Sequence, residues 1–222
     1  MTSPKRIQNN LTAGVERRVL NWLCLRLPLW CTPDRLTAFA FFGAVVIGVG
    51  YVLSNFHRGW LLLAVAGYAI NWFGDSLDGS IARHRKIERP NYGYFIDHSL
   101  DALANTVLVL GLGLSPYVRM DTAMFGLAGY LLLSIHTFIS AKLFGVMQLT
   151  YLGGGPTEMR LTLMVMTLLM YWHGPEASIA WPIRDVMLSP FDVFVSVLGL
   201  ALAGVFTFHT VRTGRELFRK GG

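Results

Sequence analysis

Residues 60–101 read WLLLAVAGYAINWFGDSLDGSIARHRKIERPNYGYFIDHSLD, and this stretch decides both the fold class and the candidate site. It begins with a long apolar run that contains no charged residue. Four aspartates follow in two pairs, Asp75 and Asp78 before a basic loop and Asp97 and Asp101 after it. Carboxylates at membrane depth are costly, so four of them within apolar helices indicate a function.

The composition of the whole chain is that of a membrane protein. Of its 222 residues, 53% are hydrophobic and only 14% are charged, whereas soluble domains average about 25% charged residues. A helix crosses about 30 Å of hydrocarbon at about 1.5 Å per residue. Six apolar stretches are long enough to do so, at 35–54, 60–84, 92–114, 122–144, 158–173 and 189–211. We therefore predict an all-α integral membrane protein with six transmembrane helices.

An amphipathic helix is predicted ahead of the first span, within residues 11–27. Its apolar residues recur at helical spacing, namely Leu11, Val15, Val19, Trp22 and Leu23. Its charged residues fall elsewhere on the helix, namely Glu16, Arg17, Arg18 and Arg26. Such a helix lies in the membrane interface. The sequence thus divides into an amphipathic juxtamembrane segment, residues 1–31, and a six-helix domain, residues 32–222.

The basic residues predict the orientation in the membrane. If the N-terminus is cytoplasmic, sixteen of the 19 Lys and Arg residues fall on the inner side. The outer side then holds only Arg58, Arg119 and Arg184. Cytoplasmic segments carry the excess of Lys and Arg, so we predict that both termini are cytoplasmic. The net charge is +6, and the Lys and Arg residues lie in short segments between apolar runs. This placement favours anionic lipid headgroups over nucleic acid as the partner.

Helical spacing arranges the four aspartates in two stripes. Residues three or four apart share one face of a helix. Asp75 and Asp78 therefore lie on one stripe, and Asp97 and Asp101 lie on another. The loop between the two helices is short, which predicts antiparallel neighbours. By helical rise, Asp78 lies roughly 10 Å from the cytoplasmic end of its helix, and Asp97 and Asp101 lie roughly 7–14 Å from the end of theirs.

Divalent cations offer the best explanation of these carboxylates. Four neighbouring carboxylates repel one another, and their oxygens are the ligands that Mg²⁺ or Mn²⁺ prefers. Two such ions about 3.5–4 Å apart would clamp the attacking and leaving oxygens of a phosphoryl displacement. Arg83 follows the first stripe and suits a phosphate through its forked guanidinium. Gly79 and Ala82 leave room for a flat ligand against the helix.

These residues resemble the signature of the CDP-alcohol phosphotransferase family. The matching pattern is Asp75-x-x-Asp78-Gly79-x-x-Ala82-Arg83, followed by Gly93-x-x-x-Asp97-x-x-x-Asp101. Its nine defined positions make it highly specific. Residues 32–37, which read TPDRLT, resemble a second recurrent stretch of the family. With the six spans and the amphipathic helix, the resemblance covers nearly the whole chain.

The resemblance implies a reaction and a role for each motif residue. A CDP-linked alcohol would donate its phosphoalcohol part to the hydroxyl of a second alcohol, at least one of the two being a lipid, and CMP would leave. Asp75, Asp78, Asp97 and Asp101 would bind the metals, and Asp101 would also act as the base. The CDP pocket would be lined by Asp75, Asp78, Gly79, Ala82 and Arg83. The family also implies a homodimer and a place in phospholipid biosynthesis.

Three departures from the family pattern stand out. Nine residues separate Arg83 from Gly93, one more than is usual. Asp34 stands where the family usually has Asn. Ala102 follows the last aspartate, where many members that use phosphorylated acceptors have Lys. The third departure argues against a glycerol-phosphate or inositol-phosphate acceptor.

The substrates stay open at this stage. Residues 95–102 resemble the choline and ethanolamine branch, which uses a CDP-linked small alcohol as donor. The short chain instead resembles members that use CDP-diacylglycerol, and it favours a bacterial inner membrane. Lys142 and Arg160 face the cytoplasm in the predicted topology. We expect them either to hold the acceptor headgroup or only to set the topology.

Two other classes of protein also place acidic residues in membranes. A cation-coupled transporter would show helices broken at mid-membrane and symmetry between its halves, and neither is evident here. A magnesium-dependent prenyltransferase would hold a diphosphate on two separated aspartate-rich motifs of a longer chain. It would leave Gly79, Ala82 and Arg83 unexplained.

Overall fold

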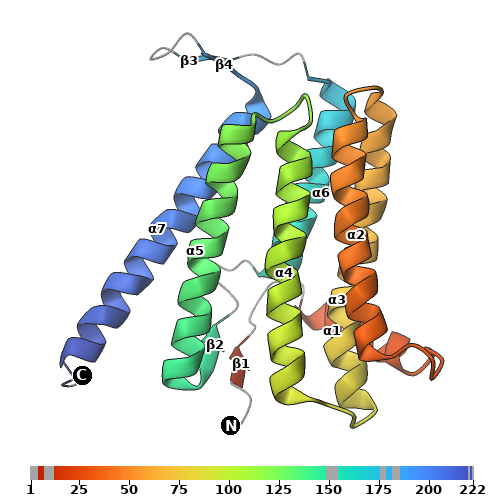
Figure 1. The fold of residues 1–222 in the computed structure, drawn as a ribbon, viewed down its shortest axis with the longest axis vertical. Coiled ribbons are helices and arrows are strands. Elements are labelled where there is room, and N and C mark those ends of the chain that lie inside the picture. Colours follow the sequence, from red (N-terminus) through yellow and green to blue (C-terminus); the bar gives the residue numbers. More distant parts are fainter. Residues whose placement is uncertain are drawn as a thin grey trace.

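The computed structural model describes residues 5–7, 13–148, 155–175, 179–181, 186–219 and 221. Its helices follow the predicted spans closely (Figure 1). They are α1 Ala13–Cys24, α2 Pro33–Leu53, α3 Leu61–His84, α4 Pro90–Gly113, α5 Met120–Phe144, α6 Pro156–His173 and α7 Pro190–Arg219, with a 3₁₀ turn, η1, at Arg58–Trp60. Leu11 and Arg184, which the sequence analysis used, lie outside the described residues.

Two short strand pairs accompany the helices. β1 (Lys5–Ile7) pairs in parallel with β2 (Val146–Gln148), and Lys5 lies opposite Val146. β3 (Ile179–Trp181) pairs antiparallel with β4 (Val186–Leu188). The sequence did not predict them. Each strand has three residues, and the pairing satisfies backbone groups in segments outside the helices.

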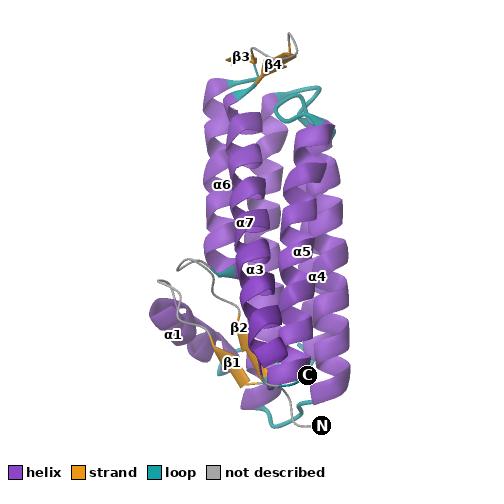
Figure 2. Ribbon diagram, turned by 90° about the vertical axis from the view of Figure 1, so that its left-hand side faces the viewer, coloured by secondary structure: helices purple, strands orange, loops and turns teal. Residues whose placement is uncertain are grey.

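The helices α2 to α7 lie side by side and run alternately up and down the bundle (Figures 1 and 2). Among the described helices, α2, α4, α5 and α7 are long and apolar enough to cross a membrane. The predicted mostly helical fold with membrane-length helices is therefore confirmed, whereas the count of six spans and the amphipathic interfacial helix at the N-terminus stay predictions. α3 and α6 are less apolar because they carry polar residues such as Asp75, Asp78 and Arg160.

Glycines bring α3 and α4 close to α2. A Cβ atom at Gly74 of α3 would lie 2.5 Å from the Leu36 carbonyl oxygen of α2. A Cβ atom at Gly111 of α4 would lie 2.5 Å from Cα of Gly48 of α2. Only glycine permits such close backbone approach. α2 therefore packs against both aspartate-bearing helices.

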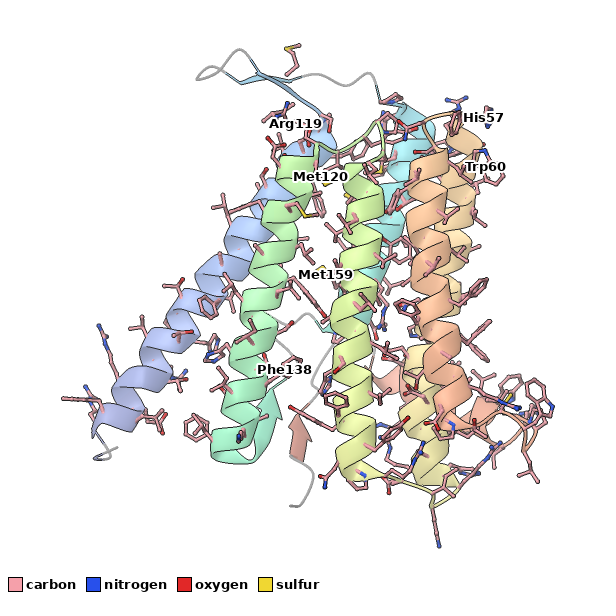
Figure 3. The ribbon with its side chains drawn as sticks, in the orientation of Figure 1. His57, Trp60, Arg119, Met120, Phe138 and Met159 are labelled. Atoms are coloured by element: carbon pink, nitrogen blue, oxygen red, sulfur yellow. The ribbon has the colours of Figure 1, made fainter. Side chains whose placement is uncertain are left out.

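The main apolar core closes one end of the bundle. It includes the fully buried Tyr51 and Tyr68, whose hydroxyl groups lie 3.1 Å apart. Tyr51 also lies 2.6 Å from the hydroxyl of Thr167 on α6. Trp60 and Arg119 lie at this same end (Figure 3). The connection between α3 and α4 lies at the opposite end, together with α1 and the end of α7 (Figure 1).

Helix α1 packs against the lower part of α3. Leu20 and Leu23 pack against a second apolar cluster, whose buried members are Cys24, Leu36, Leu77 and Ile81. Val19 and Trp22, which were predicted on the same face as Leu23, are exposed instead. The apolar residues of α1 thus divide between contacts with the bundle and exposed positions.

Arg85, just after α3, fastens the segment that joins α1 to α2. Its guanidinium donates hydrogen bonds to the carbonyl oxygens of Leu27 and Pro28, both at 2.9 Å, and of Cys31 at 2.7 Å. These carbonyl groups follow the end of α1, where helical partners run out. Arg85 therefore ties the α1–α2 connection to the base of α3.

Candidate active site

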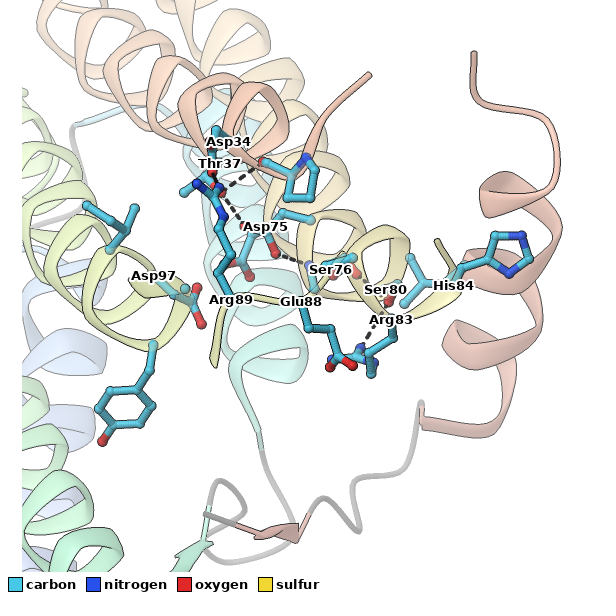
Figure 4. Close-up of a pocket in the computed structure, with 18 of the residues that line it drawn as sticks. Asp34, Thr37, Asp75, Ser76, Ser80, Arg83, His84, Glu88, Arg89 and Asp97 are labelled. Carbon is cyan, nitrogen blue, oxygen red and sulfur yellow. Dashed lines mark hydrogen bonds and ion pairs between the residues drawn. The ribbon is translucent and has the colours of Figure 1, made fainter. Parts of the chain in front are cut away.

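A pocket of about 960 Å³ lies at the end of the bundle where α3 meets α4. Residues from α1, α2, α3, α4 and α6 line it, and Figure 4 shows it from nearby. The predicted aspartates all line this pocket: Asp75, Asp78, Asp97 and Asp101. The structure thus brings together the two stripes that helical spacing predicted.

Asp78 has the smallest exposed fraction of the four aspartates, at 9%. The hydroxyl of Thr37, on α2, lies 2.6 Å from its Oδ2 atom. The same hydroxyl lies 3.1 Å from the Pro33 carbonyl oxygen, so its single proton has two acceptors and the shorter contact is with Asp78. Thr37 therefore orients Asp78 from the neighbouring helix.

Asp75 is paired with a cation from α6. Nη2 of Arg160 donates a hydrogen bond to Oδ2 of Asp75 at 2.6 Å. Both side chains are about one-fifth exposed, at 18% for Arg160 and 20% for Asp75. The helix α6 begins part-way along the bundle, so its first turns face the pocket (Figure 2). This ion pair links α6 to the aspartates of α3.

Asp97 and Asp101 form a compact group with His98. One ligand atom from each of the three side chains lies within 4.8 Å of the others. Nδ1 of His98 lies 3.8 Å from Oδ2 of Asp97, and the imidazole stacks on Phe138 of α5 at a ring distance of 4.7 Å. His98 was not among the predicted ligands because its sequence position lies off the aspartate stripe.

The donor set fits a hard divalent cation. Four carboxylates from α3 and α4 line one pocket, and they lie close enough to repel one another electrostatically. Oxygen ligands of this kind suit Mg²⁺ or Mn²⁺, and the cations would offset the repulsion. The arrangement can therefore hold metal together with an anionic ligand.

The motif residues between the aspartates leave an open surface on α3. A Cβ atom at Gly79 would meet only the end of the Arg83 side chain, with Nη1 at 3.2 Å. Arg83 is exposed, and its Nη2 lies 3.4 Å from the Ser80 hydroxyl. Gly79, Ala82 and Arg83 all line the pocket. A planar ligand with phosphate groups would fit against this part of the helix.

The two predicted acceptor residues lie in different places. Arg160 lines the pocket, as described above. Lys142 is exposed in the last turn of α5 and is not among the residues that line the pocket. The structure therefore supports a site role for Arg160 and places Lys142 where a topology-setting charge would lie.

Two departures from the family pattern meet in one ion pair. Arg89, in the longer loop before α4, pairs with Asp34 at the start of α2 (Figure 4). Both residues line the pocket. Two features of the sequence could have indicated this pair: Asp34 stands where the family usually has Asn, and Arg89 lies in the loop that is one residue longer than usual. Their opposite charges suggest a shared role that the sequence analysis missed.

Helices of membrane-spanning length with a carboxylate-lined pocket at one end are typical of an integral membrane protein. The family model described as CDP-alcohol phosphatidyltransferase matches residues 30–207. The chain belongs to this family. The match covers the pocket helices α2, α3, α4 and α6, and it gives no support to a transporter or a prenyltransferase.

Curated relatives agree with this assignment. The archaetidylinositol phosphate synthase of Methanothermobacter thermautotrophicus is 28% identical over 120 residues, which cover 54% of this chain and 57% of the relative. The enzyme of the same name from Pyrococcus horikoshii is 29% identical over 107 residues, covering 48% and 53%. Cholinephosphotransferase 1 of Danio rerio is 24% identical over 211 residues, covering 87% and 52%. The chain thus spans about half the length of the curated relatives it matches.

Proposed function

We propose that this protein is a membrane CDP-alcohol phosphotransferase of phospholipid biosynthesis. It moves a substituted phosphate from a CDP-linked alcohol to the hydroxyl of an acceptor alcohol, and CMP is released. The observation that carries the proposal is that all four motif aspartates, from two helices, line one pocket. Family membership supports the same reaction class.

The aspartates divide the work in this proposal. Asp75, Asp78, Asp97 and Asp101 hold the divalent cations. Bound Mg²⁺ or Mn²⁺ would supply the positive charge that offsets the diphosphate and stabilises CMP as the leaving group. Asp101 takes the proton from the acceptor hydroxyl. Asp101 lies one turn further along α4 than Asp97 and also lines the pocket, which supports this role.

The nucleotide lies along the open surface of α3 in this proposal. Gly79 and Ala82 present little side-chain bulk there, so the cytidine diphosphate approaches the helix closely. Arg83 contacts a phosphate through its forked guanidinium. The aspartates Asp75 and Asp78 contact the same group through the metals. The size of the pocket, about 960 Å³, supports binding of a nucleotide together with a second substrate.

The acceptor end of the pocket is assigned to Arg160. Its guanidinium lies beside Asp75 and still lines the pocket, so a polar headgroup can reach it. Lys142 takes no part in this contact. One relative is named as an archaetidylinositol phosphate synthase and another as a cholinephosphotransferase, so the relatives leave the substrates of this chain open. The donor is thus either CDP-diacylglycerol or a CDP-linked small alcohol, and at least one substrate is a lipid.

The placement in the membrane completes the proposal. All six helices from α2 to α7 cross the bilayer, and α1 lies in the interface. Both termini and the pocket face the cytoplasm of a bacterial inner membrane, which the sixteen-to-three charge bias supports. Two copies form a homodimer, as is usual in the family.

A transfer assay tests the reaction. The purified protein is incubated with Mg²⁺ or Mn²⁺, labelled CDP-diacylglycerol or CDP-linked small alcohols, and a panel of lipid and phosphorylated acceptors. We expect release of CMP with one donor class and loss of release with a chelator. The Asp78→Asn variant is the control for background hydrolysis. Absence of CMP with every donor would contradict the proposed function.

A further inference from the structure

Glu16 of α1 lies in the pocket wall as an acceptor for three side chains. Its Oε1 accepts hydrogen bonds from Trp72 Nε1 at 3.2 Å and from the Ser76 hydroxyl at 3.0 Å. The Thr157 hydroxyl lies 3.0 Å from Oε1 and 3.2 Å from Oε2. Trp72 and Ser76 belong to α3, whereas Thr157 belongs to α6. One carboxylate therefore joins three helices.

The groups that Glu16 holds are next to the ion pair of the site. Ser76 directly follows Asp75 along α3. Thr157 lies three residues before Arg160, on an adjacent position of the same helical face. The Arg160–Asp75 contact of 2.6 Å thus connects the same two helices, one turn away from the contacts of Glu16.

The orientation of α1 makes this role possible. Glu16, Leu20 and Leu23 recur at helical spacing and face the bundle together. The other end of this segment is fastened by Arg85 through backbone carbonyl groups. α1 is therefore held by Glu16 and, through the connection that follows the helix, by Arg85, and Glu16 also lines the pocket.

We propose that Glu16 is a positioning residue that sets Arg160 against Asp75. Its carboxylate holds the first turn of α6 on α3, so the guanidinium faces the acceptor end of the pocket. Because three donors already contact the Glu16 carboxylate, we do not assign it to the metal-binding group of aspartates. This inference rests on the proposed function, because Arg160 is there assigned to the acceptor.

The test begins with Glu16→Gln, which keeps the size of the side chain and replaces one acceptor oxygen by a donor amide. We expect the acceptor KM to rise about ten-fold, as for the loss of a hydrogen bond to a charged group, while the donor KM stays unchanged. Thr157→Val removes the α6 partner alone and should show the same pattern. Arg18→Ala, an exposed change on the same helix, is the matched control and should leave both constants unchanged.

A purely structural role would give another result. It would lower the amount of active protein and hence kcat, and both KM values would stay the same. A double-mutant cycle sharpens the distinction. In the Arg160→Gln background, Glu16→Gln should change the acceptor KM by less than about two-fold, because both changes act through one contact. Additive effects would overturn the proposal.

Hydrogen exchange separates this inference from the proposed function. Glu16→Gln and Thr157→Val should each speed amide exchange in α1 and the first turn of α6, whereas Arg18→Ala should not. This measurement needs no turnover, so it can be read even if the protein releases no CMP. Unchanged exchange in both variants would show that Glu16 does not hold these helices together.

Discussion

Arg160 and Asp75 lie 85 residues apart in the sequence, and yet their side chains meet at 2.6 Å inside the pocket. The contact sets a guanidinium against one of the four carboxylates that line the pocket. In the proposed function, the same guanidinium also faces the acceptor. An anionic headgroup that approaches Arg160 therefore meets the same residue that balances Asp75.

Replacing Arg160 tests this arrangement directly. We expect Arg160→Gln to raise the acceptor KM about ten-fold, since hydrogen bonds to charged groups contribute about 1.5–3 kcal/mol. The Lys142→Gln variant removes the same charge from an exposed position outside the pocket and is the matched control. Steady-state kinetics with varied acceptor measures both. An unchanged acceptor KM for Arg160→Gln would end the proposed contact.

Replacing Asp101 should separate chemistry from binding. Asp101→Asn keeps the size of the side chain but removes the proposed base. The rate of CMP release should fall about a hundred-fold or more, the usual contribution of general base catalysis. Binding of labelled CDP-alcohol should be largely retained, because the residues along α3 are intact. A variant that releases CMP at the normal rate would show that another group takes the proton.

The hydroxyl of Thr37 should influence metal activation. Thr37→Val preserves the shape of the side chain but removes the donor that lies 2.6 Å from Asp78. We expect the Mg²⁺ concentration for half-maximal rate to rise about ten-fold, given the usual contribution of hydrogen bonds to charged groups. Thr37→Ser keeps a hydroxyl and should behave like the wild type. Equal metal dependence of all three proteins would refute the positioning of Asp78 by Thr37.

Two glycines of α3 should respond in opposite ways to alanine. At Gly79, a Cβ atom meets only the end of a flexible side chain, and alanine favours helix by about 1 kcal/mol. Gly79→Ala should therefore keep or slightly raise the melting temperature and weaken binding of the CDP-alcohol.

At Gly74, a Cβ atom would lie 2.5 Å from the Leu36 carbonyl oxygen. Gly74→Ala should destabilise the protein by about 1–3 kcal/mol, the usual cost of overpacking. Thermal unfolding and labelled-nucleotide binding measure the pair. Tight nucleotide binding by Gly79→Ala would argue against a ligand that lies on this surface.

The helices and the aspartate stripes could be predicted because their signals are local. The apolar runs are uninterrupted, and Asp97 and Asp101 share a face by helical spacing alone. The partners from elsewhere in the chain could not be predicted. Thr37 and Arg160 reach the aspartates only because α2 and α6 pack beside α3, and that packing depends on contacts far apart in the sequence.

Glu16 shows where the local rule fails. A charged residue on an amphipathic helix is normally assigned to the polar face. The spacing of Glu16 with Leu20, Leu23 and Cys24 was present in the sequence and pointed to the buried side. Arg85 was likewise counted only as a topology-setting charge. Its guanidinium instead binds carbonyl groups more than fifty residues earlier, as no local pattern indicates.

The hydrogen bonds of Arg85 and Glu16 also impose an order of assembly. The carbonyl groups of Leu27 and Cys31 can accept hydrogen bonds from Arg85 only after α3 has been synthesised and its C-terminal end lies beside α1. Glu16 can meet Thr157 only after α6 has emerged as well. Helix α1 can therefore complete its contacts only when α3 and α6 are both in place. A chain that stalls before α6 has been synthesised lacks Thr157 and so cannot complete this wall of the pocket.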